Sequence, residues 1–474
     1  MKINVKSLVY TVIIVGAFVF LCFRADKVPV IGSYLGGDLF GEQSTLNPDG
    51  VDGLLGPIAQ SHYDSFMLTL WITALLCITV GGPFVYALFA FKEKKGFDPK
   101  KDKLPKQSHG NTKVEVSLIF YSTILLFIIA FLPFGKEKIP AIEGIAYFFE
   151  GKSNREGVHT LPEKDPFTIN VTGHQWWFSF HYPAQGIVTS NEMVFPIDTP
   201  VKINLETNDV IHSFWLAKIA GKVDLMPGQT NSMWLYADTE GNYSGQCAEY
   251  CGDSHAYMLF RGIATSQDKF EKWVEAQKKP AVVESLEGKV KEGYDLFMGK
   301  TLYSESKKHG METNPVTCAT CHILGTTEDY QFEPYRKSPY PNLTHFAERT
   351  TIAAGWRDSN HDEIKKWIQQ PGKVKPGNRM WEKFAQAYGV IDSDTTQDIW
   401  NRDETESNAH YEFFTDEEAD AITAFLLSLK NPDAPDWNEI YGKPIKSRKQ
   451  EPTTQDPKKV KASEKSTKDK LAKN

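Results

Sequence analysis

Four of the six cysteines in this chain lie in two close pairs, and each pair is surrounded by other side chains that can bind a metal. The first pair, Cys247 and Cys251, lies in the stretch SGQCAEYCGDSHAYM, and the second pair, Cys318 and Cys321, lies in CATCH. The other two cysteines lie in apolar runs, where a thiol is most simply a small buried hydrophobic group. The two pairs are therefore the first candidates for chemistry.

The string CATCH has the spacing of a c-type haem attachment site. In such a CxxCH string, the two thiols form thioether bonds to the porphyrin and the next histidine binds the iron. A redox dithiol and half of a zinc site are the alternatives, but zinc would require a second pair of ligands and no cysteine follows Cys321. The sequence predicts that Cys318, Cys321 and His322 bind haem c.

Haem iron in electron-transfer proteins usually takes a second axial ligand, either methionine or histidine. Met380, in KPGNRMW, is the only methionine after His322 and is the predicted ligand. The competing ligands are His345, His361 and His410. Of these, His361 and His410 lie in charged or polar helical surroundings that are typical of surface residues.

The loop around the first pair offers a second set of ligands. Its side chains that can bind a metal are Cys247, Glu249, Cys251, His255 and Met258, and His212 lies upstream in DVIHSFW. Two thiolates and two imidazoles could hold a tetrahedral zinc, and two cysteines outside the membrane could form a disulfide. Thiolate, thioether and imidazole together are the soft ligands that select copper, and the methionine has no role in either alternative. Two cysteines four residues apart could also bridge two copper ions, each with one imidazole.

The elements that must position these residues begin with a predicted β domain. Between about residues 167 and 267, short runs rich in β-branched and aromatic residues alternate with turn residues. These runs are FTINVTG, WWFSFHY, VKINLE, MWLYAD and LFRGIAT. Their number and spacing predict a β-sandwich or a small barrel, with the first cysteine pair in a loop near the last strands.

The pattern becomes helical near residue 268. Helical periodicity is found in DKFEKWVEAQ, GKVKEGYDLFM and HDEIKKWIQQ, the last of which stops before Pro371. Thr415 and Glu418 form a predicted capping box at the start of TDEEADAITAFLLSLK. We therefore predict an all-helical domain over residues 285–432. The lysine-rich remainder, residues 433–474, has few apolar residues and is predicted to be disordered.

Three apolar runs precede the β domain. Phe66–Phe91 and Val116–Phe134 are long enough to span a bilayer, whereas Leu8–Phe23 is either a signal peptide or a membrane helix. No small-residue cleavage site follows the first run, which favours a retained helix. The loop between the second and third runs carries eight lysines, so the positive-inside rule places it in the cytoplasm and residues after 134 outside. The net charge of -7 does not favour nucleic acid as a partner.

Together these strings resemble subunit II of cytochrome c oxidase. The resemblance rests on the pattern CxExCxxxHxxM, the upstream HSFW, the strings GHQWWFSFHY and KVDLMPGQ, and the apolar helices. The segment after residue 285 resembles a class I cytochrome c, because Gly293 and Phe297 precede CATCH and Phe425 lies on the last helix. It departs from that family in a long insertion, roughly residues 299–317. The string VEVSLIFYSTI also lacks the Trp and Pro with which this helix often begins in subunit II.

The resemblance implies a multidomain fold with three kinds of part. It implies a transmembrane α-helical anchor, with an N-terminal helix and external segment over 1–60 and a helical hairpin over 61–140. It further implies a cupredoxin-like all-β sandwich over 141–278 and an all-α cytochrome c domain over 285–432.

The resemblance also implies a dinuclear copper A centre in the β domain. The implied ligands are the side chains of His212, Cys247, Cys251, His255 and Met258 and the backbone carbonyl of Glu249. In the family, the carboxylate of this glutamate also reaches a magnesium ion shared with subunit I. Trp176 matches the residue at which electrons enter, although core packing is the simpler interpretation of a sandwich tryptophan. Asp209 matches an acidic residue of the docking surface, although a lone aspartate is often only a turn residue.

The implied function is that of subunit II of a haem-copper terminal oxidase in a bacterial cell membrane. Electrons would pass from cytochrome c or another periplasmic donor, through haem c and copper A, to subunit I, where oxygen is reduced to water and protons are translocated. Subunit III is a further expected partner. Quinol-oxidising relatives lose the copper ligands, and the separate histidine-rich cluster of nitrous-oxide reductase is not evident here. The alternative from another class is a membrane-tethered electron carrier or copper-binding module without an oxidase partner.

Overall fold

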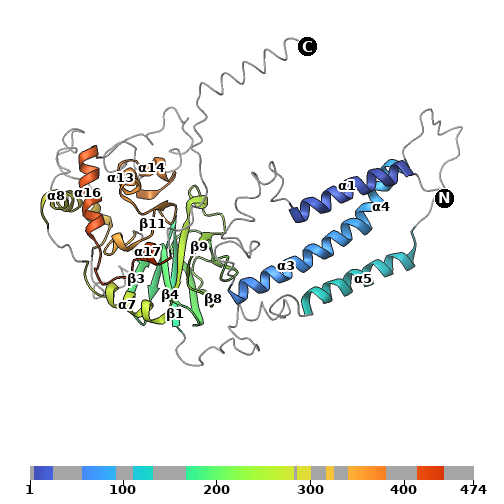
Figure 1. Ribbon diagram of the computed structural model, residues 1–474, viewed down its shortest axis with the longest axis horizontal. Helices are drawn as coiled ribbons and strands as arrows, with labels where there is room; N and C mark the ends of the chain where they lie inside the picture. Colours follow the sequence, from blue (N-terminus) through green and yellow to red (C-terminus); the bar gives the residue numbers. More distant parts are fainter. Residues whose placement is uncertain are drawn as a thin grey trace, which may run out of the picture. The chain divides into compact units, whose positions relative to one another are not determined.

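The computed structural model describes residues 5–24, 56–91, 110–131, 167–281, 286–299, 317–324, 340–380 and 414–441. Figure 1 draws these parts in chain order, with N-terminal helices in blue, the β strands in green and the C-terminal helices in yellow to red. Three predicted features lie wholly or mostly outside the described residues: the predicted cytoplasmic loop up to residue 109, most of the insertion after residue 299, and His410.

The three predicted apolar runs all form helices. These are α1 (Val5–Arg24), α3 (Pro57–Leu76) continued by the π-helical turn η2 (Cys77–Gly81) and α4 (Gly82–Ala90), and α5 (Thr112–Phe131). The π-turn ends two residues before Pro83, which has no N–H group for the helical ladder, so a local change in the hydrogen-bond pattern is expected there. Many apolar side chains of these helices are exposed, which indicates that lipid or another protein covers them.

Among the described residues, one helical stretch is long and apolar enough to cross a membrane by length and composition, and it is Ser65–Ala90. A shorter apolar helix covers Val5–Ala17. The prediction of several membrane spans is therefore supported for one span and stays a prediction for the others.

The β domain is a sandwich of two five-stranded sheets, as predicted. The first sheet has the order β3 (Ile187–Ser190), β2 (Trp177–Tyr182), β1 (Phe167–His174), β5 (Val201–Thr207) and β8 (Asn231–Leu235). The second has the order β4 (Glu192–Pro196), β10 (Leu259–Thr265), β9 (Gly241–Cys247), β6 (His212–Trp215) and β7 (Lys222–Leu225). Strands β1 and β5 pair in parallel, as do β10 and β4, and the remaining pairs are antiparallel.

The core between the two sheets is aromatic at its centre. The ring of Phe260 on β10 stacks on Phe214 at 4.6 Å between centroids, and its edge meets Phe178 at 5.2 Å. All three side chains are fully buried. A Cβ at Gly245 would overlap the Phe260 ring, so only glycine fits at this position of β9. This packing supports the end of β9, from which the first cysteine pair continues.

The C-terminal part is built mainly from short helices, but a two-stranded ribbon lies among them, so the all-helical class predicted for residues 285–432 is not confirmed. The helices are α7 (Gln267–Gln277), α8 (Gly288–Phe297), α10 (Cys318–Cys321), α13 (His361–Gln369), α14 (Pro371–Val374), α16 (Asp416–Ser428) and α17 (Trp437–Tyr441). The turns η3 (His255–Tyr257) and η4 (Phe346–Glu348) and the ribbon β11 (Thr351–Ile352) with β12 (Arg357–Asp358) complete the described elements. The capping box is confirmed, since Thr415 Oγ1 accepts the Glu418 amide at 3.2 Å and Glu418 Oε2 accepts the Thr415 amide at 2.9 Å.

Helices α8 and α16 cross closely at a glycine. A Cβ on Gly293 would overlap the carbonyl oxygen of Ala421. Around this point, the ring of Phe425 lies 5.5 Å from that of Tyr294 and 5.4 Å from that of Phe297. The two helices therefore approach closely at Gly293, Phe297 and Phe425, the residues that carry the resemblance to class I cytochromes c.

The beginning of the predicted disordered tail requires correction. Trp437 on α17 is buried in the core of the β-sandwich, and the hydroxyl of Tyr441 lies 2.7 Å from Thr265 Oγ1. Residues 433–441 therefore belong to the folded part, because two aromatic side chains anchor a segment whose average composition is polar. The remainder, residues 442–474, lies outside the described residues.

The helical part meets the β-sandwich at a buried carboxylate. Oε1 of Glu192, on β4, accepts hydrogen bonds from the amide and hydroxyl groups of Thr350 and Thr351, all at 2.8–2.9 Å. Arg261 lies opposite Glu192 in the register of β10 and is also buried, and burial lowers its pKa to about 10. A buried carboxylate that accepts four hydrogen bonds defines a specific contact between the two parts.

We predict that Gly293→Ala destabilises the helical part. The new methyl group would force α8 away from α16, and overpacking of this kind costs about 1–3 kcal/mol. Denaturant unfolding followed by circular dichroism measures the loss in free energy of unfolding. The neighbouring exposed variant Glu292→Ala should change this free energy by less than about 0.5 kcal/mol. Equal stability of the two variants would contradict a tight helix crossing.

Candidate functional site

The predicted ligands of the first cysteine pair converge at one end of the β-sandwich. Cys247 ends β9, and its sulfur lies 3.8 Å from that of Cys251, 3.9 Å from Nδ1 of His212 and 3.2 Å from the carbonyl oxygen of Glu249. The sulfur of Cys251 lies 3.6 Å from Nδ1 of His255 and 3.8 Å from the sulfur of Met258. Six potential ligand atoms from strands β6 and β9 and the loop after β9 thus surround one small volume.

The separation of the two sulfurs argues against a disulfide in this arrangement. A disulfide bond is about 2.05 Å long, whereas these atoms are 3.8 Å apart. The Cys251 thiol lowers the pKa of Cys247 to about 4 against the effect of burial, and the resulting thiolate raises the pKa of Cys251. A bound cation would displace the remaining proton, because metals bind thiolates.

A hydrogen bond to Asp209 fixes the orientation of the His212 ring. Oδ1 of Asp209 lies 2.8 Å from Nε2 of His212, which leaves Nδ1 facing the cysteines. Burial opposes both charges, but this hydrogen bond lowers the pKa of the carboxyl group and, with the contact to Cys247, raises that of the imidazole. The ring also packs tightly on the backbone, since a Cβ at Gly173 would lie 2.7 Å from Cδ2 of His212. Asp209 therefore orients a predicted ligand, and its expected place on a docking surface stays a prediction.

The CATCH residues line a large cavity. The space between the lining side chains amounts to about 1360 Å³, counting the part open to solvent. Phe297, Leu343, Ile352 and Leu426 form part of its apolar wall. Such a wall suits a flat apolar macrocycle.

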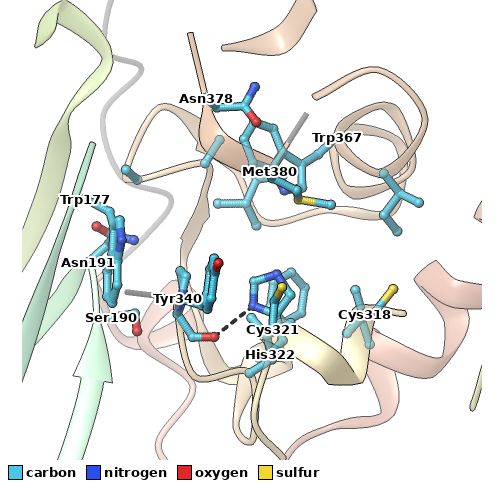
Figure 2. Close-up of a pocket in the computed structure, with 18 of the residues that line it drawn as sticks. Trp177, Ser190, Asn191, Cys318, Cys321, His322, Tyr340, Trp367, Asn378 and Met380 are labelled. Carbon is cyan, nitrogen blue, oxygen red and sulfur yellow. Dashed lines mark hydrogen bonds between the residues drawn. The ribbon is translucent and has the colours of Figure 1, made fainter. Parts of the chain in front are cut away.

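His322 and Met380 lie on opposite sides of this cavity, as Figure 2 shows. Nδ1 of His322 is 2.9 Å from the carbonyl oxygen of Pro341, so the ring presents Nε2 as its other nitrogen. Histidines that bind a metal through one ring nitrogen commonly donate from the other nitrogen to a carbonyl or carboxylate oxygen. Burial lowers the pKa of His322, which favours the neutral imidazole that a metal ion requires.

The competing histidines that the structure describes are engaged elsewhere. Nδ1 of His345 is 2.8 Å from Oε1 of Glu348, and Nε2 of His361 is 2.9 Å from Oδ1 of Asp420. Neither histidine lines the CATCH cavity. Among the described residues, Met380 is therefore the best candidate to face His322.

A bridge of two residues connects the cysteine loop with the CATCH cavity. The side-chain amide of Gln175 and the indole N–H of Trp176 both donate to the carbonyl oxygen of Cys251, at 2.8 and 3.0 Å. Gln175 and Trp176 also line the CATCH cavity. Trp176 is 8% exposed, as expected for a residue packed in the core. It nevertheless contacts both candidate sites, through its hydrogen bond to Cys251 and through the wall of the CATCH cavity.

Sequence reasoning missed the residues that hold this bridge from the helical side. Nζ of Lys375 donates to the carbonyl oxygen of Trp176 at 2.7 Å, and Nη2 of Arg379 donates to Oε1 of Gln175 at 2.6 Å. Both residues lie in KPGNRM, the string that contains the predicted iron ligand Met380. Their position in this string is the feature of the sequence that could have identified them. The hydroxyl of Ser254 also donates to the carbonyl oxygen of Pro376, so the two loops contact each other directly.

Comparison with known proteins identifies one family. The family described as cytochrome c oxidase subunit II, periplasmic domain, matches residues 184–263. Cytochrome c oxidase subunit 2 of Alkalihalophilus pseudofirmus is 35% identical over 326 residues, which cover 69% of this chain and 82% of that protein. The protein of the same name from Bacillus sp. strain PS3 is 30% identical over 396 residues, 82% of this chain and 91% of the relative.

More distant similarity extends to other oxidases. Quinol oxidase subunit 2 of Bacillus cereus is 26% identical over 238 residues, 50% of this chain and 74% of that protein. The crystal structure of the periplasmic domain of subunit II of cytochrome oxidase from Bradyrhizobium japonicum is 34% identical, covers 24% of this chain and 94% of that chain, and has a TM-score of 0.23.

The extent of similarity to the first two relatives shows that the chain belongs to the cytochrome c oxidase subunit II family. The resemblance drawn from the motifs is confirmed at this level. Members of the family normally bind copper A, and the described residues include a buried group of His212, Cys247 and Cys251 that could hold a metal ion.

We predict that Asp209→Asn weakens copper binding by about 10–100-fold, because loss of the carboxylate that accepts from Nε2 leaves the His212 imidazole less basic and less well oriented. Competition between the purified chain and a chelator for added copper measures this affinity. Asp224→Asn, at an exposed position of β7, is the matched control and should leave the affinity unchanged. If the Asp209 and Asp224 variants bind copper equally well, Asp209 does not support a metal ligand.

Proposed function

We propose that this chain is the electron-entry subunit of a haem-copper terminal oxidase. In this proposal, it takes electrons from cytochrome c or another periplasmic donor through its own haem c and copper A. Electrons then pass to subunit I, where oxygen is reduced to water with proton translocation. One observation supports this above all. Six potential ligand atoms of the copper A pattern surround one small volume, and a single layer of hydrogen-bonded residues, Gln175 and Trp176, separates them from the CATCH cavity.

The donor set fits a pair of copper ions better than a single zinc ion. Tetrahedral zinc takes four ligands, whereas a thioether and a backbone carbonyl lie here beside two sulfurs and two imidazoles. The proposed ligands are His212, Cys247, Glu249 through its carbonyl oxygen, Cys251, His255 and Met258. When bound, the copper pair would take up and release one electron at a time. Retention of the full set favours a cytochrome c type of oxidase over a quinol oxidase.

The CATCH cavity fits haem c in a class I cytochrome c domain over residues 285–432. Cys318 and Cys321 would attach the porphyrin, and His322 and Met380 would face the iron from opposite sides. When bound, haem c would carry one electron. The crossing of α8 and α16 at Gly293 supports this assignment, because it matches the helix arrangement expected for the class.

The position of Trp176 refines the proposed route of electron entry. Its indole is almost fully buried and lies beside the chain's own CATCH cavity, so an external protein has little access to it. We therefore assign Trp176 to the transfer between the two sites of this chain. The external donor would instead meet the helical domain.

The remaining assignments concern the complex. Helices α3 to α5, together with α1, would form a multi-pass anchor in a bacterial cell membrane, with both redox sites on the outer face. Subunits I and III are the proposed partners. Glu249 is exposed, so its carboxylate could reach a magnesium ion shared with subunit I.

A membrane-tethered electron carrier without an oxidase partner is the alternative. The similarity to oxidase subunits over most of the chain argues against it. Purification in mild detergent distinguishes the two, because an oxidase subunit should bring with it a second chain that has haem a absorbance. Isolation as a single chain would favour the carrier.

Metal analysis should find about two copper ions and one iron ion for each full-length chain expressed without partner subunits. The double variant Cys247→Ser/Cys251→Ser should lose the copper and keep the iron, because the two sites use different ligands. One zinc ion and no copper in the unaltered chain would refute the copper A assignment.

Met380→Ala should remove the spectral features of methionine ligation in both oxidation states and lower the haem reduction potential, since methionine raises it. Absorption spectroscopy and redox titration measure the two effects. Met298→Ala changes an exposed methionine at the end of α8 and should leave both unchanged. Unaltered spectra in the Met380 variant would transfer the ligand role to a histidine.

A further inference from the structure

Lys375 is a buried lysine between the two proposed redox sites. Its residue is 3% exposed, and its Nζ donates to the carbonyl oxygens of Trp176 at 2.7 Å and Ala353 at 3.3 Å. Burial lowers the pKa of this amine to about 7. Lysine is among the residues that are least often buried, because removing an ammonium group from water is costly. A lysine at this position therefore calls for an explanation beyond packing.

Local hydrogen bonds fix the backbone around Lys375. Its amide caps the end of α14 by donating to the carbonyl oxygen of Pro371, the first residue of that helix, and its own carbonyl oxygen accepts the side-chain amide of Asn378 at 2.7 Å. Met380 follows two residues after Asn378. The lysine is thus held on the loop that carries the proposed iron ligand.

Trp176, the hydrogen-bond partner of Lys375, belongs to the β-sandwich, whereas Lys375 belongs to the helical part. Trp176 follows β1 of the sandwich, and its indole N–H donates to Cys251, a proposed copper ligand. Arg379 adds a second contact of the same kind, to Gln175, which also donates to Cys251. The methionine loop and the cysteine loop are thus connected twice: directly, through the hydrogen bond from Ser254 to Pro376, and indirectly, through one tryptophan and one glutamine that are each held at both ends.

We propose that Lys375 is a positioning residue that holds Trp176, and with it the carbonyl group of Cys251, against the loop carrying Met380. This inference rests on the proposed function. Through these contacts, Lys375 keeps the path between haem c and copper A short and constant. The transfer itself moves one electron, with the haem iron oxidised and the copper pair reduced by one unit, and requires no other reactant.

The test uses Lys375→Met in the full-length chain within its purified complex. Methionine preserves most of the volume and removes the N–H donors and the charge. The matched control is Lys373→Met, two residues earlier on α14 and exposed. Arg379→Met, at an exposed position, removes the contact to Gln175 without opening a space in the interior and is the second test variant.

The first readout is amide hydrogen exchange, which does not depend on activity. Loss of a buried hydrogen bond to the carbonyl oxygen of Trp176 should shift the equilibrium about tenfold toward a state in which the two loops have separated. Peptides covering residues 170–180 and 247–258 should then exchange about tenfold faster in Lys375→Met, and less so in Arg379→Met. Exchange in Lys373→Met should match the unaltered protein.

The second readout is the rate of electron transfer from haem c to copper A after flash reduction of the haem by a ruthenium photoreductant. With both metal sites fully loaded, the rate should fall about tenfold or more in Lys375→Met and by a smaller factor in Arg379→Met. Unchanged exchange or an unchanged rate in Lys375→Met would overturn the proposal.

Two further outcomes are also decisive. If Lys375→Met does not fold, the test rests on Arg379→Met. Hydrogen exchange and an electron-transfer rate equal to those of the unaltered protein in Arg379→Met would then overturn the proposal. If the unaltered chain lacks haem c or copper, the proposed function fails, and this result is distinct from a chain with both metals in which Lys375 has no effect.

Discussion

The carbonyl oxygen of Cys251 is the point on which the functional arrangement depends. Two N–H groups, from the side chains of Gln175 and Trp176, converge on it from a different part of the sandwich. Through these bonds, the loop after β9 is tied to the turn between β1 and β2. Because the same two residues line the CATCH cavity, any displacement of this oxygen would change both candidate sites together.

Further polar groups are buried where the helical part meets the sandwich. Glu192 accepts four hydrogen bonds from Thr350 and Thr351, and Lys375 donates across the same boundary. Burying such groups is costly unless their partners are in place, so only one docked arrangement satisfies them. In contrast to apolar packing, which tolerates sliding, these contacts fix the relative position of the two parts. A fixed position is what electron exchange over a short distance requires.

Much of the fold was predictable because it depends on local pattern. The alternation in FTINVTG and LFRGIAT identified β1 and β10, and the capping box at Thr415 identified the start of α16. The predicted runs do not include β3, β4, β6 and β7, since four or five residues show too little alternation to be distinguished from a loop. They also lack the seven-residue β9, in which two glycines interrupt the pattern, so Cys247 ends a strand rather than lying in the expected loop. Average composition hides Trp437 in the polar tail, because its burial depends on the distant sandwich core.

The atoms that can bind metals are evident from the residues alone. CATCH and CAEYCGDSHAYM each hold their ligands within a few residues, and the chemistry of thiol, imidazole and thioether follows from residue type. How the two clusters meet is evident only from the folded chain. Lys375 and Trp176 are 199 residues apart, and no local pattern indicates that one donates to the other. Their contact exists because the helical part docks on the sandwich, and docking depends on buried polar groups whose partners lie far away in the chain.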